Sequence, residues 1–505
     1  MSGSPVRPTT HVARHGLGHL RPKLHFSPSA GFMNDPNGLL HDGERYHLYY
    51  QFAPGPLAVH GHICWGHALA EDLYHWHDAP TAIRETADGQ AFSGCALIDH
   101  RNDSGLFAGP GPQNIVAIYT RHRDGRQNQW LAISQDGGLD FEEPAGINPV
   151  LDIGSDSFRD PKVFFHAPSG RWIMVVALAR AHRIGFYGSG DLLHWQALSE
   201  FGPEGMLGID YECPNLVELD IEGGGRRWVL IISINPGAPQ GGSGSQYFVG
   251  DFDGERFVPD PQGLRLLDAG KDHYAIQVVE GLPSDQATGI GWLGNWQYCQ
   301  EVPSEGWRGV MTLPRGLGLR RDWMGGLSLV QHVRGLEPLR VPIARPRIDS
   351  SLMPDQPLTD LDLPVDAAVE LLLRFHLESL PTAPPGRGGR LVLCFGNAQG
   401  ERLEIGYDAA SHQLWTDRGE LRGFSHPFFS QRSAIALGPD RREVRLQLII
   451  DGCSLEMLAQ DGEYSMSSMI YPAAPLDRLA IYVEAGQAGF GQLELNRLQS
   501  TLTRS

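Results

Sequence analysis

The stretch Asp72-Leu-Tyr-His-Trp76 returns almost unchanged as Asp191-Leu-Leu-His-Trp195, and this repetition decides the fold. Looser copies are Asp136-Gly-Gly-Leu-Asp-Phe141 and Asp253-Gly-Glu-Arg-Phe257, so the four closing aromatics lie 65, 54 and 62 residues apart. An Asp can cap a tight turn through nearby backbone amides, and the aromatic can pack between neighbouring sheets. Repeats of this size that contain short β-rich runs, such as Trp172-Ile-Met-Val-Val176, are typical of four-stranded propeller blades.

The chain is therefore expected to be all-β, with a five-bladed β-propeller followed by a C-terminal β-sandwich. A length of 505 residues already indicates two large domains. We assign residues 1–22 to a flexible N-terminal segment, 23–342 to the propeller, 343–363 to a linker rich in Pro and Asp, and 364–505 to the sandwich. The sandwich is predicted from runs with period-two alternation, such as Val444-Arg-Leu-Gln-Leu-Ile-Ile450.

The net charge of the chain limits the classes of partner that it is expected to bind. A formal net charge of −18 disfavours nucleic acid and anionic membrane surfaces, whereas a neutral sugar is indifferent to it. No apolar stretch reaches the 18 residues of a membrane span, so no membrane partner is expected. Residues 1–23 have no apolar run like that of a secretory signal, which predicts a cytoplasmic location, although secretion by another route stays open. The oligomeric state, including a homo-oligomer, is also left open.

Metal and cofactor signals are weak. The six cysteines are scattered without a CxxC pair. His60-Gly-His62 and His75-Trp-His77 resemble metal-binding pairs, but no neighbouring carboxylate or cysteine completes a ligand set. We expect no metal ion and no organic cofactor.

A polar residue opens each predicted blade. These residues are Asp35, Ser93, Asp160, Glu212 and Asp272, which lie 58, 67, 52 and 60 residues apart, in step with the repeat. If the first strand of every blade lines the central channel, the five side chains meet in a deep, acidic pocket. Each local motif is an ordinary turn or ion-pair sequence when taken alone; the common spacing is what favours a site.

Three carboxylates of this set match the needs of glycoside hydrolysis with retention. One carboxylate attacks the anomeric carbon, and a second protonates the leaving oxygen and later deprotonates water. Asp35, Asp160 and Glu212 supply the number and type of groups. Asn34 and the turn amides are expected to keep a nucleophile at Asp35 ionised, whereas Cys213 is expected to raise the pKa of its neighbour Glu212.

A resemblance makes this reading specific. The chain resembles glycoside hydrolase family 32, which holds invertases, exo-inulinases and levanases, from about residue 21 to its end. The motifs that carry the resemblance, in order, are His25-Phe-Ser-Pro28, Gly31-Phe-Met-Asn-Asp-Pro-Asn-Gly38, Tyr46-His-Leu-Tyr-Tyr-Gln51, Trp65-Gly-His-Ala68, Phe92-Ser-Gly94, Phe158-Arg-Asp-Pro-Lys-Val163 and Tyr211-Glu-Cys-Pro214.

The resemblance implies roles for the residues at the matched positions. Asp35 would be the nucleophile, Glu212 the general acid/base, and Asp160 a stabiliser of the transition state with Arg159 beside it. The residues implied to line or border the fructose subsite are Asn34, Gln51, Trp65, Phe92, Ser93, Asp272 and Trp296. The sequence departs from the family at Phe32, where the family usually carries Trp, so contacts to the leaving group are expected to differ.

The sequence thus predicts a retaining, exo-acting β-fructofuranosidase whose small-molecule carbohydrate substrates are sucrose and fructo-oligosaccharides or fructans. The preference among these substrates is left open. One alternative is a transfructosylating enzyme that uses the same carboxylates. Another is a non-catalytic sugar-binding propeller, which the intact set of Asp35, Asp160 and Glu212 disfavours.

Overall fold

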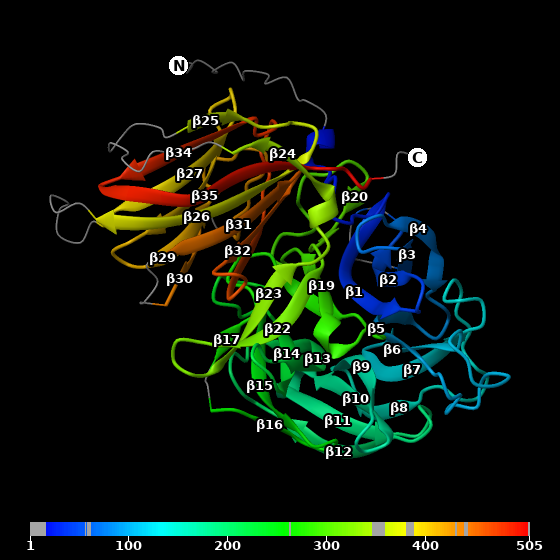
Figure 1. The fold of residues 1–505 in the computed structure, drawn as a ribbon. Helices are drawn as coiled ribbons and strands as arrows, with labels where there is room; N and C mark the ends of the chain where they lie inside the picture. Colours follow the sequence, from blue (N-terminus) through cyan, green and yellow to red (C-terminus); the bar gives the residue numbers. More distant parts are fainter. Residues whose placement is uncertain are drawn as a thin grey trace, which may run out of the picture.

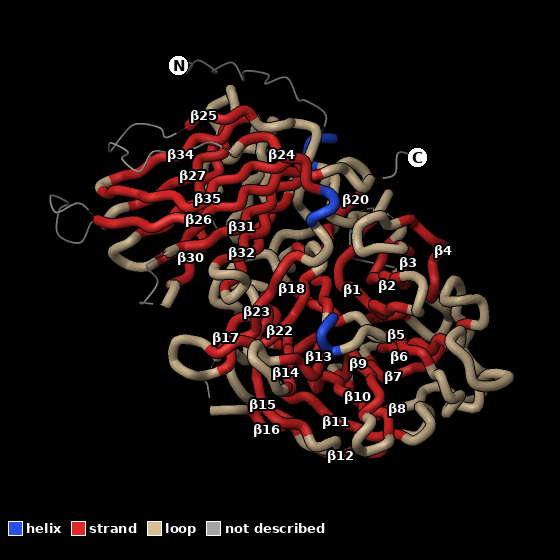
Figure 2. Tube along the Cα trace, viewed as in Figure 1, coloured by secondary structure: helices blue, strands red, loops and turns tan. Residues whose placement is uncertain are grey.

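Strands joined by loops and turns form the molecule, and helix is nearly absent from its described part (Figures 1 and 2). The computed structural model describes residues 17–55, 57, 62–261, 264–345, 359–379, 388–429, 432–438 and 443–502. Within these ranges the helices are four 3-10 turns: η1 (Leu17–Leu20), η2 (Ala179–Ala181), η3 (Ser284–Gln286) and η4 (Glu337–Leu339). No helix among them is long and apolar enough to cross a membrane.

Residues 31–333 fold into five sheets of antiparallel blade strands, the blades of a propeller. Blade one contains β1 (Gly31–His41), β2 (Tyr46–Ala53), β3 (Cys64–Ala70) and β4 (His77–Ile83). Blade two contains β5 (Gln90–Ile98), β6 (Ile115–Arg123), β7 (Arg126–Ser134) and β8 (Leu151–Ser155). Blade three contains β9 (Phe158–His166), β10 (Arg171–Leu178), β11 (Arg183–Ser189) and β12 (Gln196–Phe201).

The last two blades are less regular. Blade four contains β13 (Asp210–Asp220), β14 (Arg226–Asn235), β15 (Gly244–Phe252), β16 (Phe257–Pro259) and β17 (Arg265–Leu266). Blade five contains β18 (Tyr274–Val278), β19 (Thr288–Leu293), β21 (Val310–Met311), β22 (Arg315–Arg321) and β23 (Leu327–Val333). The short strand β20 (Trp307–Arg308) pairs in parallel with β1 and so joins the segment after β19 to blade one.

The first strands of the five blades form a closed ring. Contacts run from β1 to β5, β9, β13, β18 and back to β1. Such a ring places the beginning of every blade around one axis, as expected for a propeller.

The repeated acidic turns occupy the same place in four blades, between the third and fourth strands. Asp72 Oδ1 accepts hydrogen bonds from the amides of Tyr74 and His75, at 2.9 and 2.8 Å. Asp191 Oδ1 accepts in the same way from the amides of Leu193 and His194, at 3.0 and 2.8 Å. The Asp therefore caps the turn, and the sequence repeat marks the outer hairpin of each blade as predicted.

The C-terminal domain is a sandwich of two six-stranded sheets. One sheet has the order β24 (Arg340–Ala344), β35 (Gly486–Leu498), β26 (Ala368–Ser379), β31 (Val444–Asp451), β32 (Ser454–Ala459) and β33 (Tyr464–Met469). The other has the order β25 (Thr359–Asp362), β34 (Arg478–Glu484), β27 (Arg390–Gly396), β28 (Arg402–Asp408), β29 (Gln413–Asp417) and β30 (Arg432–Ala436).

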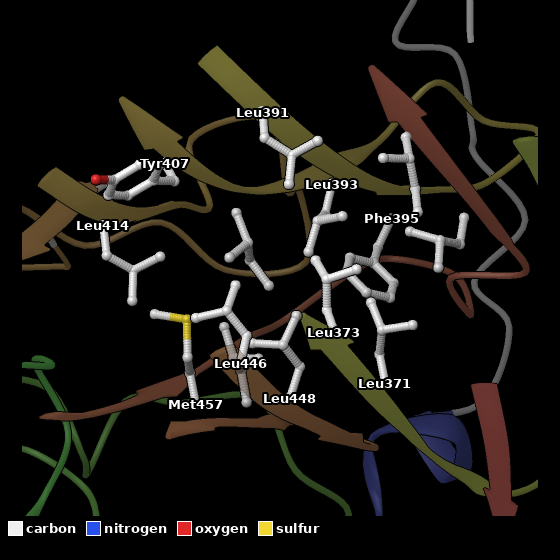
Figure 3. Packing of buried hydrophobic residues seen from close by; sticks show 14 of the residues in the cluster. Leu371, Leu373, Leu391, Leu393, Phe395, Tyr407, Leu414, Leu446, Leu448 and Met457 are labelled. Atoms are coloured by element: carbon white, nitrogen blue, oxygen red, sulfur yellow. The ribbon is translucent and has the colours of Figure 1, made fainter. Parts of the chain in front are cut away.

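Alternating apolar side chains from both sheets fill the sandwich core. Leu371 and Leu373 of β26 face Leu391 and Leu393 of β27 across the layer, all at about 1–2% exposure (Figure 3). This packing explains the period-two pattern that the sequence shows in these strands.

The domain boundary is displaced from the predicted one. β24 crosses residue 342 and pairs with β35, so it already belongs to the sandwich. The predicted linker 343–363 ends in another sandwich strand, β25, and residues 346–358 lie outside the described part of the chain. Of the predicted flexible segment 1–22, residues 1–16 likewise lie outside it.

Candidate active site

A β-bulge in the first strand of every blade builds the site. The register between first and second strands breaks at the residues between Met33 and Pro36, Ala91 and Gly94, Arg159 and Lys162, Glu212 and Asn215, and Tyr274 and Gln277. Three residues at these breaks are left-handed: Asp160 (φ 64°), Cys213 (φ 47°) and Ala275 (φ 51°). Bulges re-aim side chains, so five equivalent bulges around one axis turn polar groups toward the channel.

Asp35 lies in the bulge of β1 and is 8% exposed. Its Oδ2 accepts a hydrogen bond from Ser93 Oγ at 2.9 Å and lies 3.6 Å from Cys213 Sγ. Burial and the charge of Glu212 raise the pKa of Asp35 to about 6, although hydrogen bonds from Asn34, Ser93 and Cys213 oppose the rise. The carboxyl is therefore less acidic than the sequence argument expects, while Asn34 acts in the expected direction.

Asp160 lies in the bulge of β9, 5% exposed. Its amide donates to Thr120 Oγ1 at 2.9 Å, and its Oδ2 accepts from the Cys213 amide at 3.0 Å. Burial raises the pKa of Asp160 to about 7; the cation of Arg159 opposes this rise, while the charges of Glu212 and Asp35 add to it.

Cys213 does not do what its place in the sequence suggests. Its thiol lies 3.6 Å from Asp35 Oδ2 and 3.7 Å from Asp160 Oδ2. The left-handed backbone at Cys213 turns the thiol toward these two carboxylates, whereas Glu212 is occupied by other donors. The thiol joins the two aspartates by weak hydrogen bonds, instead of providing an apolar neighbour for Glu212.

Glu212, on β13, has a polar partner for each oxygen. Arg159 donates to Oε1 from Nε and Nη2, at 3.1 and 2.9 Å. The hydroxyl of Tyr274 is hydrogen-bonded to Oε2. Tyr274 was not predicted from the sequence, although Glu212 and Tyr274 each lie directly before the bulge of their blade.

Three further predicted residues support the backbone of β5 that carries Ser93. Trp65 is fully buried, and its Nε1 donates to the carbonyl of Phe92 at 2.9 Å. Gln51 Nε2 donates to the carbonyl of Ala91 at 3.1 Å. The ring of Phe92 stacks on His122, with centroids 4.6 Å apart.

An aromatic group lies beside these carboxylates. Trp296 is half-buried, with its ring centroid 5.1 Å from that of Trp292 and 6.3 Å from that of Phe32. Phe32 itself is fully buried, so its influence on a leaving group would pass through Trp296. Trp292, Phe32, Tyr274 and Cys213 belong to one buried cluster, against which Phe92 and Trp296 pack.

Asp272 is a correction to the sequence argument. Its carboxylate is fully buried and pairs with Arg418 Nη1 of the sandwich at 2.9 Å. Its other partners are the hydroxyl of Tyr298 and the amide of Met469, the latter at 2.8 Å. Asp272 precedes β18, whereas the bulge of blade five falls at Ala275, and its buried carboxylate joins the two domains.

The opening beside Glu212 is a pocket of about 590 Å³. Its lining residues are Phe92, Gln127, Asp156, Ser157, Arg159, Arg180, Asp210 and Glu212. Asp210, the first residue of β13, was not predicted from the sequence, because a lone Asp outside a motif carries no recognisable signal.

The histidine pairs singled out in the sequence have ordinary partners where they are described. His62 pairs with Glu85 and His75 with Asp72, while His60 lies outside the described residues. Across the described ranges, no group of three or more His, Cys, Asp or Glu side chains is arranged to hold a metal ion.

Comparison with known proteins connects this geometry to a family. The family model described as "Glycosyl hydrolases family 32 N-terminal domain" matches residues 25–332. The model described as "Glycosyl hydrolases family 32 C terminal" matches residues 354–497. An extracellular exo-inulinase of Meyerozyma guilliermondii is 36% identical over 475 residues, covering 89% of this chain and 90% of that protein. An invertase of Schizosaccharomyces pombe is 38% identical over 468 residues, covering 88% and 79%. The crystal structure of exo-inulinase from Aspergillus awamori superposes with a TM-score of 0.89 at 31% identity, covering 96% of this chain and 99% of that one.

The predicted cytoplasmic location is wrong by the same comparison. Relatives from Meyerozyma guilliermondii and Aspergillus niger are named extracellular exo-inulinases, which contradicts the prediction. The prediction rested only on the composition of residues 1–23, which is a weaker indicator than similarity along most of the chain.

Both domain matches, the relatives and the propeller with its sandwich agree: the chain belongs to glycosyl hydrolases family 32 and is a glycoside hydrolase that acts on fructosides.

Proposed function

We propose that the chain is a retaining, exo-acting β-fructofuranosidase that releases terminal non-reducing β-D-fructofuranosyl residues from sucrose and from fructo-oligosaccharides or fructans. One observation carries the proposal: Asp35, Asp160 and Glu212 come from three blades and face one another, two of them through the thiol of Cys213. Relatives named for inulin and for sucrose cleavage support the breadth of the substrate range.

The first half of the reaction is formation of a covalent fructosyl-enzyme. A carboxylate oxygen of Asp35 attacks the anomeric carbon of the terminal fructose, while the bond from that carbon to the leaving oxygen breaks. Glu212 gives its proton to the leaving oxygen, which departs as a hydroxyl of the released sugar. In the second half Glu212 takes a proton from water, whose oxygen attacks the same carbon and frees Asp35.

The remaining polar groups fit supporting roles. Asp160 is placed to accept hydrogen bonds from ring hydroxyls as positive charge develops on the sugar. Tyr274 is hydrogen-bonded to Oε2 of Glu212. A hydroxyl can donate to the ionised carboxylate or accept from the protonated acid, so it can follow Glu212 through both states.

The fructose subsite would be formed around Asp35. Asn34 and Ser93 are hydrogen-bonded to its carboxylate, and Trp296 offers an aromatic face nearby. Gln51, Trp65 and Phe92 fix the backbone on which Ser93 stands. Arg159 completes the polar wall beside Glu212.

Transfer of fructose to a sugar instead of water uses the same carboxylates and stays the second candidate. The partition depends on how well an acceptor sugar competes with water for the fructosyl-enzyme. A silent sugar-binding propeller is disfavoured by the intact hydrogen-bonded set around Asp35 and Glu212.

Product analysis tests the proposal. The protein is incubated with sucrose, 1-kestose, inulin and levan, and the sugars are separated by chromatography. Free fructose as the first product supports exo-hydrolysis, early accumulation of larger oligosaccharides supports transfer, and no turnover of any substrate refutes both.

Variants test the roles. Asp35→Asn and Glu212→Gln should each lose nearly all turnover while the unfolding temperature stays close to that of the parent. Azide should partly restore turnover to Glu212→Ala, because the anion attacks the fructosyl-enzyme without a general base, frees Asp35 and leaves as fructosyl azide. Asp140→Asn, an exposed ion-pair residue on blade two, is the matched control and should keep full activity. Activity retained by Asp35→Asn would refute the nucleophile assignment.

A further inference from the structure

Arg159 is shared among three carboxylates. Its Nη2 lies 2.9 Å from Glu212 Oε1 and 3.0 Å from Asp210 Oδ2, and its Nε lies 3.9 Å from Asp160 Oδ2. The guanidinium is largely buried, with 11% of the side chain exposed. Two carboxylates therefore share one terminal nitrogen of one cation at nearly equal distance, and this nitrogen donates a hydrogen bond to Glu212.

This competition bears on the acid/base. A guanidinium that donates to Glu212 favours the ionised carboxylate and so opposes the protonated form. The proposed first step requires Glu212 to carry a proton. In the proposed site Arg159 lies beside the sugar, so another group must offset its stabilisation of the ionised form of Glu212.

Asp210 lies where its negative charge can offset that effect of Arg159. It stands two residues before Glu212 on β13, so that both side chains lie on the same side of the strand. Its other oxygen, Oδ1, lies 2.7 Å from Nε of Arg180, which belongs to η2. One oxygen of Asp210 thus pairs with Arg180, while the other pairs with Arg159.

We propose that Asp210, paired with Arg180, is a positioning residue that shares the positive charge of Arg159 with Glu212 and so keeps the acid/base protonated to higher pH. This inference rests on the proposed function of Glu212. Asp210 acts through Arg159 and through its own negative charge, which also disfavours a second charge on Glu212. Two ion pairs share Asp210: one joins it to Arg180 and the other joins it to Arg159.

The other ionisable groups around Glu212 and Arg159 come from five elements and are left unchanged by the tests below. They are Asp35 on β1, Asp160 on β9, Tyr274 on β18, Cys213 on β13 itself, and His122 on β6, which faces Arg159.

The test is the pH profile of kcat/KM for sucrose, whose alkaline limb reports the acid of the free enzyme. Asp210→Asn removes the competitor for Arg159, so the alkaline limb should move to lower pH by at least about half a unit. Arg180→Gln leaves Asp210 wholly to Arg159 and removes a positive charge, so the limb should move to higher pH. A role limited to holding the pocket together would lower turnover in both variants without shifting the limb in opposite directions.

Asp156→Asn is the matched control. Asp156 lines the same pocket and is exposed, and no ion pair joins it to Arg159 in the described part of the chain. Its removal changes the charge of the pocket equally and should leave the limb in place. An equal shift in Asp156→Asn and Asp210→Asn, or an unmoved limb in Asp210→Asn, would overturn the inference. If the parent protein does not cleave sucrose or fructans at all, the proposed function fails instead.

Discussion

A buried histidine at the domain interface gives the sharpest prediction about stability. His25, which precedes β1, lies between two carboxylates of the sandwich, with Nδ1 2.8 Å from Asp451 and Nε2 2.8 Å from Glu456. Glu456 also pairs with Arg315 of blade five. All of these side chains are fully buried.

The size of the effect follows from the pKa of His25. Burial lowers it, but the hydrogen bonds to Asp451 and Glu456 outweigh burial and raise it from 6.5 to about 9. A histidine whose pKa is higher in the folded state stabilises the fold fully below the unfolded pKa, and this stability is lost as the pH rises toward the folded pKa. At about 1.4 kcal/mol per pKa unit, His25 contributes about 3 kcal/mol at pH 6.5 that is absent above pH 9.

Urea unfolding at pH 6.5 and at pH 9 measures this contribution. The parent protein should lose about 3 kcal/mol more across this interval than His25→Gln does. Burial lowers the pKa of Lys271 to about 8, which acts in the opposite sense, but both proteins share it. His194→Gln, whose histidine pairs with Asp191 at the surface, is the matched control and should keep the slope of the parent. Equal slopes in the parent and in His25→Gln would refute the reasoning.

Three further predictions concern the site and its surroundings. Tyr274→Phe should lower kcat for sucrose by about 10- to 100-fold, because Glu212 Oε2 loses its hydroxyl partner; an unchanged kcat would exclude a role in the proton transfers. Asp272→Asn should cost about 3–5 kcal/mol of unfolding free energy by leaving Arg418 buried without its carboxylate, whereas KM for sucrose should not change; a raised KM with unaltered unfolding would return Asp272 to the subsite. The acid limb of kcat/KM for sucrose should fall below about pH 6, since burial raises the pKa of Asp35 to about 6 and protonation removes the nucleophile; a profile that stays flat to pH 4 would contradict this.

Much of the architecture could be predicted because four of the five blades contain a turn whose sequence signal is local. The Asp72 and Asp191 turns each cap a hairpin with their own neighbouring amides, so their spacing reports the blade repeat directly. Asp160 and Glu212 could be placed near the axis for the same reason, since each follows the turn of the preceding blade, and Asp35 opens the first blade in step with them. The two-residue strand β20, which joins the segment after β19 to blade one, has no such signal.

The errors arise where a single residue position or a distant partner matters. Repeat spacings between 52 and 67 residues cannot locate the bulge of blade five, so Asp272 was taken in place of Tyr274. The partner of Asp272 is Arg418, 146 residues away in the other domain. The direction of the Cys213 thiol depends on a left-handed backbone angle that neighbouring residues in the sequence do not reveal.

Trapping the fructosyl-enzyme tests the central claim most directly. The parent and the Glu212→Gln variant are mixed briefly with sucrose, quenched with acid, and digested for mass spectrometry. The account predicts that the peptide containing Asp35 gains the mass of one fructosyl unit. An adduct on another residue, or turnover of sucrose with no adduct on Asp35 in either protein, would contradict it.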